Sequence, residues 1–244
     1  MFDTLLYIAG FGFSGMYGLA PLLVYSQNKQ PERFKLHSVP KESILKETEE
    51  YFHELADEIE KNGFRYIDAS EFALKQTKTR FMLFVHDEKK LSILLTQIST
   101  ANVQTLIYVE VSQHFEDVTT IDVLNASMDS VFPPSPKKVT FPFPDIKSVS
   151  KLVSITERII ASYLSSKTPT TLPKGKELET IADYLNKEQD ELIRKGYLQK
   201  DAKDGLRGMT LKGAYLLTWK LLWPVKQIRH AQKQSFVKKI LAEA

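Results

Sequence analysis

The sequence of 244 residues contains no cysteine and only five histidines, and it has neither a P-loop nor an HExxH sequence. Without cysteine the chain forms no disulfide and no thiolate metal site. His86 and His114 are the one histidine pair that an antiparallel sheet could bring near each other, and two strand spacings of roughly 9.6 Å are wide for a shared zinc ion. We therefore expect no catalytic residue, no cofactor and no metal ligand.

Charge is absent from the segment Thr4 to Tyr25, and no basic residue comes before Lys29. As a helix at about 1.5 Å per residue, the segment would reach roughly 33 Å, enough to cross a hydrocarbon core of about 30 Å. A signal peptide would need a basic start, and a core helix in water would be weakened by this many glycines. The sequence predicts a transmembrane anchor over residues 1–28, in which a helix-packing face is formed by Gly10, Ser14 and Gly18.

The same segment contains a GxGxxG pattern from Gly10 to Gly15. A dinucleotide loop would need a helix and a parallel strand to follow, whereas Pro21 interrupts the next turn. Basic residues gather on the C-terminal side of the apolar segment, at Lys29, Arg33, Lys35 and Lys41. By the positive-inside tendency, we predict a single-pass membrane protein with its N-terminus outside and most of the chain in the cytoplasm.

A connector is predicted at residues 29–40. Between Ser38 and Gly63, apolar residues recur every three or four residues, which predicts an amphipathic helix. The period then changes to two, which predicts strands near 64–67, 80–86, 91–99, 103–114 and 118–124. Their short links favour antiparallel neighbours. The order of elements from Val39 to Ala126 resembles the cystatin-like or NTF2-like layout. The predicted fold class is α+β, with a helix on a four- to five-stranded antiparallel meander over residues 41–131.

Prolines at residues 132–147 predict an extended connector, and a helical region follows over residues 148–208. We expect its helices at 148–164 and 177–195. The next segment, Gly196-Tyr197-Leu198 through Asp204-Gly205 to Leu211-Lys212-Gly213, resembles the wing of winged-helix regulators. That resemblance implies a DNA-binding module near 177–213. The 19 residues available for the two preceding helices are few, and they show no Arg-rich recognition face, so nucleic acid is not the favoured partner.

Basic charge is concentrated at the C-terminus, because the net charge of +3 includes +6 from Thr210 to Ala244. The sequence predicts a basic amphipathic helix over residues 209–244. Its tryptophans lie four residues apart and so share one face. We predict a membrane interface made by Trp219, Trp223, Lys220, Lys226 and Arg229. Alternatively, this helix packs on its own domain.

These features together predict a membrane-anchored binding or scaffolding protein without catalytic activity. The expected partners are membrane lipid, a helix that contacts the N-terminal span and a protein of unspecified type. One alternative is a DNA-binding or regulatory module that uses the wing-like segment. The other is an enzyme with a pocket in the α+β domain, which a deep cavity lined by polar side chains would favour.

Overall fold

The computed structural model describes residues 18–74, 77–100, 103–126 and 137–222, and the single residues 224, 225, 227, 228, 231, 232, 235 and 239. The chain divides into two units. Of the described residues, unit 1 contains 18–34 and those from 184 to 232, and unit 2 contains 35–126, 137–183 and the single residues 235 and 239. Most of unit 2 is therefore inserted in the sequence between the two segments of unit 1.

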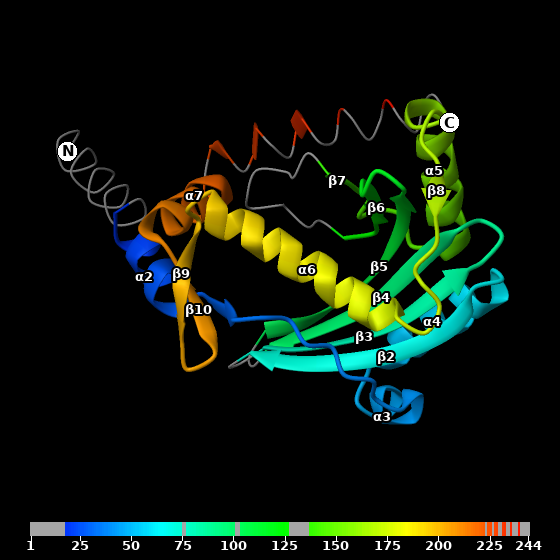
Figure 1. The fold of residues 1–244 in the computed structure, drawn as a ribbon, viewed down its shortest axis with the longest axis horizontal. Coiled ribbons are helices and arrows are strands. Elements are labelled where there is room, and N and C mark those ends of the chain that lie inside the picture. Colours follow the sequence, from blue (N-terminus) through cyan, green and yellow to red (C-terminus); the bar gives the residue numbers. More distant parts are fainter. Residues whose placement is uncertain are drawn as a thin grey trace, which may run out of the picture. The chain divides into compact units, whose positions relative to one another are not determined.

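Unit 2 is built on a seven-stranded, mostly antiparallel sheet (Figure 1). The strand order is β2-β3-β4-β5-β6-β7, with β8 paired to β5 and with β7 parallel to β6. The strands are β2 (Arg65–Leu74), β3 (Thr77–His86), β4 (Leu91–Thr100), β5 (Val103–Phe115), β6 (Thr120–Leu124), β7 (Lys138–Pro142) and β8 (Pro169–Thr170). Residues on β3, β4 and β5 alternate between the two faces of the sheet, and β-branched and aromatic side chains suit such a pleated surface.

Helices cover one face of this sheet and enclose the main core of unit 2. They are α3 (Lys41–Lys46), α4 (Glu50–Lys61) and α5 (Val149–Tyr163). Phe52 of α4 and Leu152 of α5 pack in one cluster with Phe84 and Ile93 of the sheet, and all four are at most 1% exposed. The side chain of Ser148 caps α5 by accepting a hydrogen bond from the backbone N–H of Lys151.

The predicted α+β class is confirmed, but the cystatin-like layout is wrong. The parallel strand β7 and the short strand β8 extend the expected meander of four or five strands. A second helix, α5, shares the core with α4, so the sheet does not curl around a single helix. The extra elements come from residues 138–170, which sequence periodicity assigned to a connector and a separate helical region.

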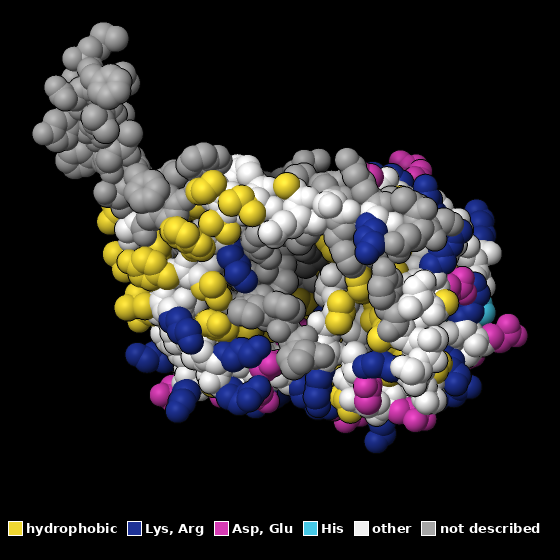
Figure 2. Space-filling model, turned by 90° about the horizontal axis from the view of Figure 1, so that it is seen from above, with side chains coloured by type: hydrophobic (Ala, Val, Ile, Leu, Met, Phe, Trp, Pro, Cys, Tyr) yellow, Lys and Arg dark blue, Asp and Glu magenta, His cyan; other side chains and the backbone are white. Residues whose placement is uncertain are grey.

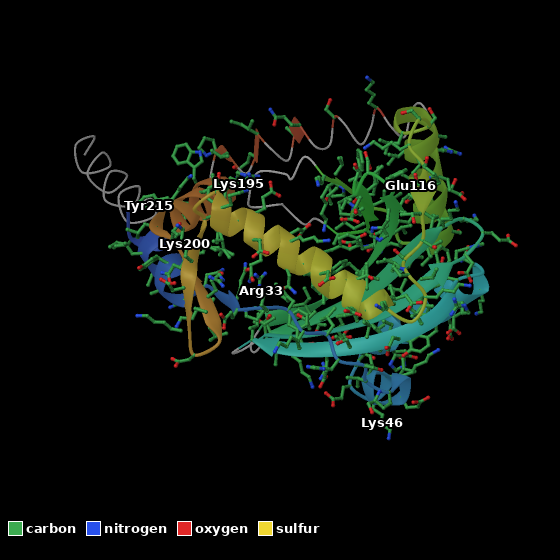
Figure 3. The ribbon with its side chains drawn as sticks, in the orientation of Figure 1. Arg33, Lys46, Glu116, Lys195, Lys200 and Tyr215 are labelled. Atoms are coloured by element: carbon green, nitrogen blue, oxygen red, sulfur yellow. The ribbon has the colours of Figure 1, made fainter. Side chains whose placement is uncertain are left out.

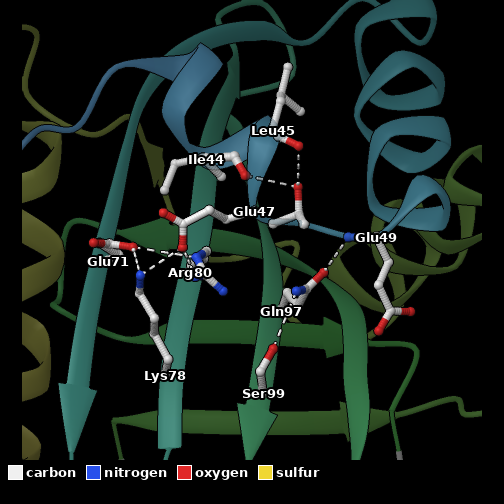
Figure 4. Close-up of polar contacts among 10 residues, drawn as sticks. Ile44, Leu45, Glu47, Glu49, Glu71, Lys78, Arg80, Gln97 and Ser99 are labelled. Atoms are coloured by element: carbon white, nitrogen blue, oxygen red, sulfur yellow. Dashed lines mark hydrogen bonds and ion pairs between the residues drawn. The ribbon is translucent and has the colours of Figure 1, made fainter.

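The helix predicted between Ser38 and Gly63 is two helices, α3 and α4. The backbone N–H of Glu49 donates to Oε1 of Gln97 on β4 at 3.0 Å, and Thr48 Oγ1 donates to the carbonyl oxygen of Ile44 at 3.0 Å (Figure 4). The hydrogen bond that Glu49 donates to Gln97 takes the place of a hydrogen bond within a helix, so α3 does not continue into α4. Ser38 does not cap α3, because its hydroxyl donates to Asp68 Oδ1 at 2.7 Å.

Unit 1 combines a three-stranded antiparallel sheet with helices from both segments of the chain. The sheet order is β1-β10-β9, so the strand nearest the N-terminus lies beside the last strand. The elements are α2 (Ala20–Gln27), β1 (Lys29–Pro31), the C-terminal part of α6 (Glu177–Arg194), β9 (Leu198–Lys203), β10 (Leu206–Met209) and α7 (Leu211–Leu221). The core cluster of this unit is small: Leu198, Met209, Ala214 and Leu217, with Val24, Leu192 and Ile193 beside it.

The predicted transmembrane anchor, and with it the single-pass membrane localisation, is wrong. Within the described residues, no helix has the length and apolar character needed to cross a bilayer. The described end of the apolar segment forms α2, whose eight residues extend only about 12 Å. This helix packs on α7 and ends at Asn28, where the chain continues into β1. Residues 1–17, including Gly10 and Ser14, lie outside the described part of the chain.

Candidate interaction surface

The wing-like segment folds as a β-hairpin in unit 1. A two-residue turn joins β9 to β10, and its residues Asp204 and Gly205 have φ angles of 55° and 70°. Asp-Gly is a favoured pair for such a turn, because both positions need positive φ. The guanidinium of Arg207 is buried and donates to the backbone carbonyl oxygens of Gln199 and Lys200. The hairpin is thus held by this side chain as well as by its turn.

The residues around the start of α7 fasten this helix to the hairpin. The hydroxyl of Thr210 donates to the carbonyl oxygen of Gly196 at 2.7 Å and accepts from the backbone N–H of Gly213 at 3.0 Å. A Cβ at Gly213 would collide with the carbonyl oxygen of Tyr197 and lie 3.0 Å from its carbonyl carbon. Lys212 extends its ammonium over the ring of Tyr197, 4.8 Å from the centroid. The residue types of the wing-like motif are therefore explained by this junction.

Side-chain amides of α6 fasten the N-terminal segment to unit 1. Gln189 Nε2 donates to the carbonyl oxygen of Pro31 at 2.8 Å, and Asn186 exchanges hydrogen bonds with both backbone groups of Phe34. Arg33 forms an ion pair with Asp190 at 2.8 Å, which raises the pKa of the arginine. These bonds fix β1, and therefore the adjoining helix α2, in unit 1.

Two helices of unit 1 leave large apolar side chains exposed. On α7, Leu211, Tyr215 and Trp219 recur every four residues and are 49%, 49% and 52% exposed. The opposite side of α7 is buried. The neighbouring α2 and the residue before it add three leucines. We call the whole set the α2–α7 surface: Leu19, Leu22, Leu23, Leu211, Tyr215 and Trp219.

Hydrophobic side chains gather in the region of α2 and α7 of unit 1 (Figure 2). Figure 3 labels Tyr215 on α7, Lys195 directly after α6 and Lys200 on β9. The segment 18–31 carries Lys29 as its one charged residue, and the segment 210–222 carries Lys212 and Lys220 and no acidic residue. The helix α7 therefore carries positive charge only, and α2 carries no charge.

The predicted site residues fall partly on this surface. Trp219 and Lys220 lie on α7, whereas Trp223, Lys226 and Arg229 are outside the described residues. Gly18 precedes α2, and a Cβ there would meet no atom within 4 Å. Its predicted role in helix packing stays a prediction, as does lipid contact by the predicted interface residues.

Sequence analysis missed the contribution of α2 and of Leu211 to this surface. The spacing of Leu211, Tyr215 and Trp219 was available as a signal, since residues four apart share a helix face. Leu19, Leu22 and Leu23 gave no comparable signal, because the apolar residues of α2 do not gather on one side of the helix.

A charged cluster on the helix-covered face of the sheet in unit 2 is internally paired (Figure 4). Lys78 Nζ lies 2.9 Å from a carboxylate oxygen of Glu47 and 2.9 Å from one of Glu71, and the buried guanidinium of Arg80 contacts both carboxylates. Hydrogen bonds from Lys78 and Arg80 lower the pKa of Glu47. These pairs join the end of α3 to β2 and β3, so the cluster has a structural role.

The histidines His86 and His114 do not form a site. In the register of β3, β4 and β5, His86 aligns with Leu91 and then with Gln113, so His114 points to the opposite face of the sheet. Burial lowers the pKa of His114, whose Nδ1 lies 3.2 Å from Thr120 Oγ1. Among the residues that the structure describes, no three His, Asp or Glu side chains could hold a metal ion.

Near His114, Ser112 and Asp122 form a buried polar pair. Ser112 Oγ donates to Asp122 Oδ1 at 2.7 Å, and Lys138 Nζ lies 3.0 Å from Asp122 Oδ2. The serine hydroxyl is thus directed at a carboxylate and not at the imidazole, unlike the nucleophile of a Ser-His-Asp triad.

Comparison with known proteins found no match for this chain among family models, curated proteins or solved structures.

Proposed function

We propose that this chain is a non-catalytic binding or scaffolding protein, and that its α2–α7 surface receives a hydrophobic segment of a protein partner. The observation that carries this proposal is the half-exposed row of Leu211, Tyr215 and Trp219 on a helix whose other side is buried. Contiguous apolar surface of this kind marks interaction sites. Tyrosine and tryptophan are also the residue types enriched at the energetic centres of interfaces.

A partner would gain free energy by covering these side chains. Fully burying a large apolar side chain is worth about 1.5–3 kcal/mol, so covering the exposed half contributes about 1 kcal/mol for each. The surface is also well supported, since Ala214 and Leu217 of α7 pack in the unit core with Val24 of α2. Side chains on a fixed pair of helices lose little conformational freedom on binding, which favours affinity.

Protein is favoured over nucleic acid because of the charge of α6, the helix that precedes the wing-like hairpin. This helix carries six acidic and two basic residues. In winged-helix regulators, the helix at this position enters the major groove between phosphates. An acidic helix would be repelled there, since phosphate contacts need Lys and Arg.

Binding is favoured over catalysis because the space between sheet and helices in unit 2 is filled. Phe52, Phe84, Ile93 and Leu152 occupy it and are nearly inaccessible. A substrate site there would have to displace these side chains.

Site-specific photo-crosslinking tests the proposal. The full chain is expressed in cells with a benzophenone amino acid in place of Tyr215, or in place of Tyr51 of unit 2, which is 39% exposed, as the matched control. We expect discrete protein adducts from position 215 and none of the same mass from position 51. Equal adduct patterns at the two positions, or no protein adduct at position 215, would refute the proposal.

A further inference from the structure

We infer that the occupant of the α2–α7 surface is an amphipathic helix of a partner protein with acidic residues along its flank. The inference rests on the function proposed above and adds the chemistry of the partner. Its first basis is charge. Residues 18–31 and 210–222, which include the surface, carry Lys29, Lys212 and Lys220 and no acidic residue. Complementary charge steers association and disfavours partners of the same sign.

The second basis is the helical geometry of the surface. Leu211, Tyr215 and Trp219 form a ridge at i, i+4 and i+8, and α2 packs beside α7. Ridges at this spacing fit between the side chains of another helix at an interaxial distance of about 8–10 Å. An incoming helix would present apolar residues at i, i+3, i+4 and i+7, as in other helix-in-groove complexes. Its acidic residues would then lie beside the lysines.

The same charges argue against a second copy of this chain as the occupant. In a two-fold symmetric dimer, each surface meets its own copy. Such a dimer through α2 and α7 would add the positive charges of two copies without any acidic residue from these segments. Like charges at an interface are unfavourable.

Fluorescence anisotropy with designed peptides tests the inference on the full chain. The probe is a fluorescein-labelled, 18-residue helical peptide with leucines at three- and four-residue spacing and glutamates elsewhere. Its twin has lysine at each glutamate position. We expect the acidic peptide to bind at least tenfold more tightly than its twin, and a central proline, which breaks the helix, to abolish binding.

Variants locate the binding. Tyr215→Ala should weaken binding of the acidic peptide at least tenfold, whereas Tyr51→Ala in unit 2 should leave it unchanged. The double variant Lys29→Glu with Lys220→Glu should remove the preference for the acidic peptide. Circular dichroism of each variant checks that the fold is kept.

Three outcomes would overturn the inference: equal binding of the two peptides, a dimer in light scattering that Tyr215→Ala abolishes, and binding to anionic phosphatidylserine vesicles without binding to the peptide. If the acidic peptide does not bind while position 215 still crosslinks to a protein, the partner chemistry is wrong and the proposed function stands. If neither occurs, both fail.

Discussion

The two units of this protein differ in how far they bury their apolar side chains. Unit 2 encloses its large aromatic and aliphatic residues between a sheet and three helices, with Phe52, Phe84 and Phe143 at most 1% exposed. Unit 1 is smaller, yet it contains nine of the thirteen large hydrophobic residues that are exposed among the described residues. These are Leu19, Leu22, Leu23, Tyr25, Leu211, Tyr215, Trp219, Leu221 and Ile228.

The difference indicates that unit 2 supplies most of the stability and that unit 1 supplies the proposed interaction surface. Unit 2 buries enough apolar surface to hold a fold, whereas the small core of unit 1 depends on polar fastening by Thr210, Gln189 and Asn186. Small cores are marginal, since the fraction of surface that is buried falls with domain size. Substitutions in each unit and a change of pH test whether this separation holds.

Truncating the core of unit 2 should have the largest effect. Phe84→Ala removes a side chain that is fully buried among α4, α5 and the sheet. We expect the free energy of unfolding to fall by about 3–5 kcal/mol, because apolar contacts are lost and a cavity is left. Urea denaturation followed by circular dichroism measures the change. Tyr51→Ala, at an exposed position, is the control and should cost much less.

Adding a methyl group where α7 meets the β9–β10 hairpin should have an intermediate effect on stability. Gly213→Ala places a Cβ against the carbonyl oxygen of Tyr197. The backbone must shift, at a cost of about 1–3 kcal/mol. Hydrogen exchange should show faster exchange in β9, β10 and α7 and unchanged exchange in β3 and β4. Gly18→Ala meets open space and is the matched control; equal effects of the two variants would contradict the proposed clash.

Acid should weaken a surface contact of unit 2. Hydrogen bonds from Lys167 and Thr119 lower the pKa of Asp117 to about 2. Because the folded-state pKa lies below the ordinary value of about 3.9, the contact stabilises the fold above that pH and is lost as pH falls toward 2. Carbon-detected NMR titration should show this low pKa, and Lys167→Gln should raise it. An ordinary pKa in the parent protein would contradict the contact.

Changing the exposed row of unit 1 should have the smallest effect on stability. Tyr215→Gln alters a half-exposed side chain, and we expect the free energy of unfolding to change by at most about 0.5 kcal/mol. Thermal unfolding followed by circular dichroism measures it. A large loss of stability would show that Tyr215 supports the fold of unit 1, and the division between a stabilising core and an interaction surface would then fail.

Part of the candidate surface could be predicted from the sequence. Helical spacing predicted that Trp219 shares a face of α7 with its neighbours. The hairpin followed from the resemblance of the segment that contains Asp204-Gly205 to the wing of winged-helix regulators. The apolar segment that includes α2 was misjudged because hydropathy alone does not distinguish lipid from a neighbouring helix as the apolar environment. The described part of the segment packs on α7 instead.

Elements whose hydrogen bonds join residues close together in the chain could be recognised from the sequence alone. Examples are α5, capped by Ser148, and α6, which begins and ends within one residue of its predicted bounds. Caps and hydrophobic periods act over one or two turns, so they can be recognised in a single sequence.

Features that join residues far apart in the sequence depend on the tertiary structure. Gln97 separates α3 from α4, and β7 adds a parallel strand to the sheet. β1 pairs with β10 although most of unit 2 lies between them in the sequence. The tertiary structure also decided which side of α7 stays exposed. The reason is physical: an exposed fraction or a strand pairing depends on which other segment lies opposite, and local sequence does not encode the position of that segment.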